Sequence, residues 1–91
     1  MRYEIKFTGR FKKDFKRAKK QNKNVEKLFE VIEKIANGEK LEAKWKDHAL
    51  SGNYAGTREC HIEPDWLLIY EVFEDTLVLS LLRTGSHSDL F

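Results

Sequence analysis

The single proline of the chain, Pro64, constrains the fold more than any other residue because strand-forming segments lie on both sides of it. Residues 57–62 precede it, and residues 66–73 follow it as a run of aliphatic, β-branched and aromatic side chains that is typical of a buried strand. A proline lacks the backbone N–H and biases the preceding residue, Glu63, toward an extended conformation. We therefore expect a tight turn at Pro64-Asp65 that joins the two strands.

This turn should hold three chemically useful side chains together at the rim of a sheet: His61, Asp65 and Trp66. A titratable imidazole, a carboxylate and a large flat ring at one sheet end could bind or cleave a nucleotide. The alternative is an ordinary hairpin in which His61 is only a polar strand residue. Both interpretations are open on this stretch alone, because a short motif is a hypothesis until its surroundings support it.

Two amphipathic helices are predicted in the first half of the chain. Thr8 and Asn24 are suitable N-cap residues, and Gly38 suits the position just after a helix end. The first helix should extend to about Gln21, and the second should cover 25–36. Their apolar residues recur at helical spacing: Phe11, Phe15 and Ala18 in the first, and Val25, Leu28, Phe29, Ile32, Ile35 and Ala36 in the second. We expect a helical hairpin whose second helix serves the core.

The order of the predicted elements defines the fold class. Alternating residues at 3–7 predict a first strand, and the almost wholly apolar run 77–83 predicts a last, central strand. The order β-α-α-β-β-β over one domain, residues 1–91, predicts a small α+β fold with the helical hairpin on one face of a mainly antiparallel sheet. Residues 39–55 form a long connection with few strand signals, and such loops are often functional.

Charge is divided unevenly along the chain. Residues 1–46 contain 15 of the 17 Lys and Arg residues but 7 of the 15 acids, whereas residues 47–91 carry a net negative charge and all three histidines. Asp14 is the only acid among the charged residues around the first helix. Like charges three or four residues apart repel, so this density of bases indicates an interaction surface for nucleic acid or an acidic protein. The predicted basic helix comprises Lys12, Lys13, Lys16, Arg17, Lys19 and Lys20.

Several classes of protein are excluded or disfavoured by composition. No apolar run approaches the roughly 20 residues that a membrane span needs, and the N-terminal residues lack the apolar core of a signal peptide. A single cysteine cannot form an internal disulfide, so we expect a cytoplasmic protein with no membrane partner. The histidines stand at 48, 61 and 87, and these spacings match no compact metal-ligand motif, so no metal or other cofactor is expected.

Three segments together carry a family resemblance. Residues 46–52 (KDHALSG), 60–70 (CHIEPDWLLIY) and 83–91 (RTGSHSDLF) closely resemble the YafQ-type toxins of the RelE superfamily in motif, order and spacing. The resemblance covers the whole chain. It implies a RelE-like fold and the mRNA-cleaving half of a bacterial toxin–antitoxin pair. One departure is Ala49, where the family commonly has proline, and this could alter the loop that carries His48.

The resemblance also implies partners and a site. Such toxins cut mRNA in the decoding site of the 70S ribosome, use no metal, and are silenced by a DinJ/RelB-like antitoxin that wraps them. The family's catalytic positions correspond to His48, His61, Asp65 and His87, with Trp66 and Phe91 as neighbouring contributors.

The chemistry of these side chains agrees with that implication. The ribose 2′-OH can attack the adjacent phosphate if the protein supplies a base, an acid and positive charge. Histidine can act in either proton transfer near neutral pH, and spacing does not say which histidine does which. Arg83 could neutralise the phosphate, and the rings of Trp66 and Phe91 could stack on bases. Two rival functions are a non-catalytic basic RNA- or ribosome-binding module and a nuclease for free nucleic acid.

Overall fold

A computed structural model describes residues 1–91 as one α+β domain, which confirms the predicted fold class. Its sheet has the strand order β1-β5-β4-β3-β2, in which only the β1–β5 pair is parallel. β5 therefore lies inside the sheet, as predicted. The elements are β1 (Glu4–Phe7), α1 (Gly9–Lys20), α2 (Val25–Ala36), the 3-10 turn η1 (Ala43–Trp45), β2 (His48–Ala49), a second 3-10 turn η2 (Gly52–Tyr54), β3 (Arg58–Glu63), β4 (Trp66–Phe73), β5 (Val78–Gly85) and α3 (His87–Leu90).

Two short elements were missed by the sequence patterns. β2 contains two residues, so no alternation could reveal it, and it adds a fifth strand to the predicted four. α3 is a single turn that begins at a capping box, in which Ser86 and Asp89 exchange side-chain-to-backbone hydrogen bonds. Gly85 lets this turn fold back onto β5, because a Cβ at Gly85 would lie 3.1 Å from the Cβ of Asp89.

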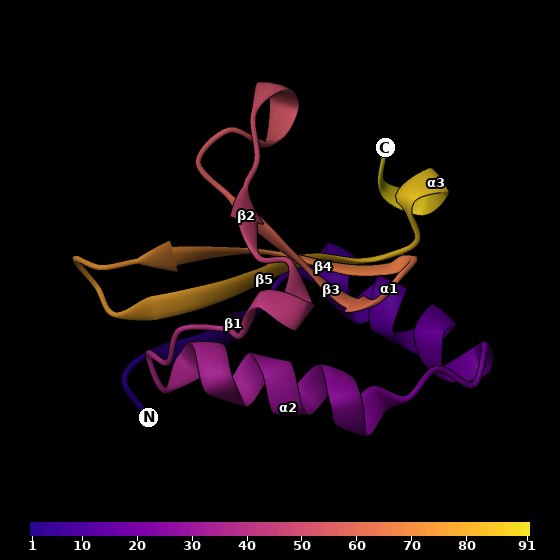
Figure 1. Ribbon diagram of the computed structural model, residues 1–91, viewed down its shortest axis with the longest axis horizontal. Coiled ribbons are helices and arrows are strands. Elements are labelled where there is room, and N and C mark those ends of the chain that lie inside the picture. The colour runs from indigo at the N-terminus through magenta and orange to yellow at the C-terminus, as the bar shows by residue number, and fades with distance from the viewer.

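The two long helices begin where the caps predicted. The side chain of Thr8 accepts a hydrogen bond from the backbone N–H of Phe11, and that of Asn24 accepts one from Lys27. Figure 1 shows α1 and α2 on the same side of the sheet. Together with that face of the sheet they enclose a cluster of 16 buried residues, which includes Phe11 and Leu28.

The opposite face of the sheet is only partly covered, and we call it the open face. The arm formed by β2 and η2 and the C-terminal turn α3 both rise from it (Figure 1). A second cluster of three buried residues, Leu67, Ile69 and Leu90, packs there with Leu50 and Tyr54. Side chains alternate along β3, so Cys60 and Ile62 enter the main core whereas Glu59 and His61 point to the open face.

The turn at Pro64-Asp65 is confirmed, and β3 and β4 pair on either side of it. Trp66 corrects one expectation. Its side chain is 1% exposed and belongs to the main core, so it lies on the helix-covered face rather than at the rim beside His61. Trp66 has the same alternation parity as Leu68 and Tyr70, which are also core residues, and a large apolar ring gains most from burial there.

Asp14 corrects a second expectation, that it shares the solvent-facing surface of α1 with the bases. Its side chain is buried and accepts hydrogen bonds from the backbone N–H of Thr84 and the guanidinium of Arg83. β1 pairs with β5 only as far as Leu81, so the backbone N–H of Thr84 lies beyond the end of β1. The carboxylate of Asp14 accepts its hydrogen bond in place of a β1 carbonyl. The exposed surface of α1 is consequently left without an acid of its own.

No helix of the structure combines the length and apolar character that crossing a membrane requires.

Candidate active site

The three histidines, which lie far apart in the sequence, converge on the open face of the sheet. The ring centroids of His61 and His87 are 5.7 Å apart, and those of His48 and His61 are 6.2 Å apart. Sheet register explains the first half of this cluster, because His48 on β2 pairs directly with Glu59 on β3, two residues from His61. His87 reaches the cluster from α3, which follows the end of β5.

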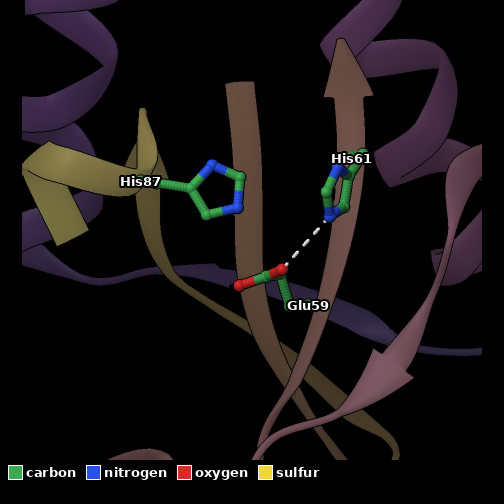
Figure 2. Close-up of side chains that lie close together, drawn as sticks. All are labelled: Glu59, His61 and His87. Carbon is green, nitrogen blue, oxygen red and sulfur yellow. Dashed lines mark ion pairs between the residues drawn. The ribbon is translucent and has the colours of Figure 1, made fainter. Parts of the chain in front are cut away.

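Glu59 lies among the histidines and was not singled out in the sequence. Its side chain is nearly buried, and its Oε1 lies 3.3 Å from Nε2 of His61 (Figure 2). The same oxygen lies 3.5 Å from Nε2 of His48. A buried carboxylate needs a compensating charge or hydrogen bond, and an imidazole N–H is a donor that can supply the hydrogen bond. The signal for Glu59 was present, since strand alternation puts it on the same face as His61.

Asp65 holds His87 with two contacts. Its Oδ1 accepts the backbone N–H of His87 at 3.0 Å and lies 2.7 Å from Nδ1 of the imidazole. These two contacts keep the pKa of Asp65 below its ordinary value, the backbone contact being the stronger cause. Because an ionised carboxylate only accepts hydrogen bonds, Nδ1 of His87 carries the proton and Nε2 is left free for chemistry.

His48 is fixed by the two residues that precede it. Lys46 adopts a left-handed conformation with φ 51°, and its carbonyl lies 2.8 Å from Nδ1 of His48. Asp47 fastens this segment to the sheet, because its carboxylate accepts hydrogen bonds from Arg58 at 2.9 Å and from the hydroxyl of Tyr70. We call Asp47, Arg58 and Tyr70 the Asp47 clamp. Burial and the contact with Asp47 raise the pKa of Tyr70, so its hydroxyl stays a donor.

The predicted substrate-binding residues are found in three different settings. Phe91 is 62% exposed beside Tyr54, with 5.4 Å between ring centroids, so its ring is open to solvent. Arg83 is committed to Asp14, to which its Nε donates at 2.6 Å, and this contact raises the pKa of the guanidinium. Trp66, in the core, has no face on which a base could stack.

The same cluster has the chemistry of a metal site. Glu59, His61 and His87 each offer one ligand atom, and these atoms lie within 4.8 Å of one another. Two imidazoles and a carboxylate are a donor set that suits zinc, copper, iron or nickel. Sequence spacing could not reveal this group, because its members come from β3 and α3 and meet only in the folded chain.

Comparison with known proteins gives the family. The family described as "Bacterial toxin of type II toxin-antitoxin system, YafQ" matches residues 3–91. The chain belongs to the YafQ toxin family. A YafQ-family relative from Escherichia coli K12, the mRNA interferase toxin YafQ, is 39% identical over 89 residues, which are 97% of this chain and 95% of that protein.

Two solved structures extend the comparison. The toxin in the E. coli DinJ–YafQ toxin–antitoxin complex is 38% identical, with a TM-score of 0.89 and coverage of 100% of this chain and 99% of that one. A metal-bound toxin from Helicobacter pylori is also 38% identical, with a TM-score of 0.92 and coverage of 98% of this chain and 99% of that one. The YafQ-family fold predicted from the three sequence segments is therefore confirmed.

Proposed function

We propose that this YafQ-family chain is a ribosome-dependent endoribonuclease that cleaves translated mRNA and is silenced by a cognate antitoxin. The observation that carries the proposal is the meeting of His48, His61 and His87 around one buried carboxylate on the open face. The E. coli relative's name, mRNA interferase toxin, supports the activity, and the DinJ complex of another relative supports the antitoxin.

The proposed reaction is attack of the ribose 2′-OH on the adjacent phosphate, with loss of the 5′-oxygen of the next nucleotide. One imidazole removes the 2′-OH proton and another protonates the departing oxygen, for which His61 and His87 are the facing pair. Glu59 and Asp65 keep these rings in place and compensate their positive charge. Phe91 offers its exposed ring to a base, and a role of Arg83 at the phosphate requires the substrate to share it with Asp14.

A 2′-deoxy substitution at the cleaved nucleotide tests this reaction directly. Programmed ribosomes carrying the substituted mRNA should resist cleavage, whereas the all-ribose mRNA should be cut to a 2′,3′-cyclic phosphate or its 3′-phosphate product. A 2′-deoxy substitution one nucleotide away is the control and should leave cleavage intact. Continued cutting at the substituted position would exclude 2′-OH attack and leave a different hydrolytic mechanism.

A metal ion is the second candidate for the same cluster, favoured by its donor set and by the metal-bound H. pylori relative. Glu59, His61 and His87 would hold the ion, which would supply Lewis-acid chemistry or, by occupying both imidazoles, block proton transfer. We favour catalysis without a metal, so cleavage should survive saturating EDTA when ribosomes are stabilised by polyamines. Loss of cleavage in EDTA, restored by zinc or copper, would support the metal instead.

The basic helix gives the protein its hold on the ribosome in this proposal. Lys12, Lys13, Lys16, Arg17, Lys19 and Lys20 are all exposed, and the only acid of α1 faces inward. Phosphate contacts of this kind are independent of sequence, so ribosome binding should weaken steeply with salt. The same surface could receive an acidic segment of the antitoxin, which would block the ribosome by occupying it.

A further inference from the structure

A cleft of about 350 Å³ lies beside His61, where α2 and η1 meet the end of β3. β2 pairs only with Arg58 and Glu59, so the edge of β3 beyond them, which carries His61, has no strand partner. The cleft follows this edge. Six of its lining residues matter here: Lys27 on α2, Lys44, Trp45 and Lys46 on the connection to β2, and His61 and Glu63 on β3.

The charge in the cleft is strongly positive. Lys27, Lys44 and Lys46 all line it, and none of the three forms an ion pair with a carboxylate. Glu63 is the only acid in the lining. Three cations facing one anion favour an anionic ligand, and a cleft of this size lies in the range of small-ligand sites.

Two of the three lysines lie against an aromatic ring at the cleft. The Nζ atoms of Lys44 and Lys27 lie 4.9 and 5.9 Å from the ring centroid of Trp45, which is itself buried. Lys46 has a left-handed backbone, whose carbonyl also contacts His48. A non-glycine residue in this conformation is strained, and such strain concentrates at functional sites.

We propose that the cleft is a subsite for the phosphate backbone of single-stranded RNA, next to the cleaved bond. The inference rests on the proposed endoribonuclease function, because its ligand is the strand that continues from the scissile phosphate at His61. An acidic antitoxin peptide would also meet the charge requirement. RNA is favoured because His61 lines the cleft, so a strand placed at the histidines enters it without a break.

Binding of a short single-stranded oligoribonucleotide, made non-cleavable by one 2′-deoxy nucleotide, tests the subsite in the absence of ribosomes. Fluorescence anisotropy over a salt series gives the slope of log K against log salt. The variant K27Q/K44Q/K46Q should bind more weakly and lose about 2 from that slope, at about 0.7 for each phosphate contact of a single strand. Its thermal unfolding should match that of the parent.

A matched control removes the same charge elsewhere. The variant K6Q/K34Q/K40Q changes three lysines that line neither the cleft nor the basic helix, and its slope should equal that of the parent. Glu63→Gln should tighten binding, because it removes the only acid in the cleft. Equal slopes for the two triple variants, or no binding by the parent, would overturn the proposal.

Two further outcomes separate this inference from its rivals. If a poly-glutamate peptide needs Lys27, Lys44 and Lys46 but the oligoribonucleotide does not, the cleft is a peptide site and the RNA proposal is wrong. If the parent never cleaves mRNA on ribosomes yet shows the lysine-dependent slope, the subsite stands and the endoribonuclease function fails. If the parent cleaves mRNA normally but K27Q/K44Q/K46Q keeps the slope of the parent, the endoribonuclease function stands and the subsite is wrong.

Discussion

The two faces of the sheet are built on different physical principles, although one strand, β3, contributes to both. On the covered face, Cys60 and Ile62 join 14 other buried residues of a continuous apolar core beneath α1 and α2. On the open face, Glu59 and His61 stand above a cluster of only three buried residues, and polar contacts hold the side chains in place. The covered face supplies rigidity, which allows the open face to keep a nearly buried carboxylate among imidazoles.

Burying a charged side chain such as Glu59 lowers the stability of the fold unless the charge has a partner. Glu59 meets this requirement through His61 and His48, whereas Asp65 and His87 form an exposed pair that pays no such cost. We infer that substitutions on the open face should affect catalysis more than folding, and that substitutions on the covered face should do the reverse. The adjacent residues His61 and Ile62 offer the sharpest comparison.

The largest effect is expected for His61→Ala and His87→Ala. Loss of one proton-transfer group should reduce the cleavage rate by about 10²–10⁴-fold, measured by single-turnover cleavage on programmed ribosomes, and should relieve growth arrest on expression. Both variants should still fold, because both residues lie outside the apolar core. Unfolding of His87→Ala in denaturant should remain close to that of the parent, whereas His61→Ala removes one of the two imidazole partners of the buried Glu59 carboxylate and should be less stable. Full toxicity of both variants would favour the non-catalytic binding module and contradict the assigned site.

Ile62→Ala should lower the stability of the protein strongly and its cleavage rate little. Removing a buried branched side chain leaves a cavity and should lower the free energy of unfolding by about 2–5 kcal/mol. The cleavage rate of the fraction that remains folded should change little, which activity and circular dichroism measured at the same temperature would show. A large rate loss in fully folded protein would mean that the two faces are not separable in this way.

The Asp47 clamp tests the boundary between the faces, since it is anchored on the sheet but positions His48. Asp47→Ala leaves the buried hydroxyl of Tyr70 without its acceptor and should cost about 1–3 kcal/mol of stability. Cleavage should fall as well, because the segment that carries His48 loses its anchor. Asp47→Asn keeps an acceptor and should restore most of the cleavage activity; if it is as inactive as Asp47→Ala, the charge rather than the anchoring matters.

The smallest expected effect is the loss of stability of α3 at low pH. The folded-state pKa of Asp65 is lowered by His87, so its contribution is present above the unfolded pKa of about 3.9 and is lost as pH falls through the folded value. The contribution of Asp89 to stability should also be lost as pH falls, because the backbone N–H of Ser86 lowers the pKa of its carboxyl group. We expect the start of α3 to loosen progressively as pH falls below about 4, visible as a shift of the His87 amide signal in NMR.

Asp65→Asn provides the control for this titration. An amide cannot ionise, so the low-pH change in the His87 signal should lose the component due to Asp65 and keep that due to Asp89. If the parent and the Asp65→Asn variant titrate identically, Asp65 does not hold α3.

Local patterns in the sequence determined the framework of this protein. A run of aliphatic, β-branched and aromatic residues predicted β4 at Trp66–Phe73, the caps Thr8 and Asn24 predicted where the helices begin, and Pro64 predicted the turn. These features depend on residues two to four positions apart, so they can be read from the chain itself. The histidines and Asp65 were likewise selected from the sequence, partly through the family resemblance.

Only the tertiary structure decided how distant residues meet. Asp14 bonds to Thr84, Glu59 lies between histidines from β2 and β3, and Trp66 turns into the core. The lysines of the cleft come from α2 and from the connection before β2. Alternation shows which residues of a strand share a face, but it does not show which distant elements that face meets. Such contacts arise from the packing of elements whose separation in the sequence is unrelated to their distance in space.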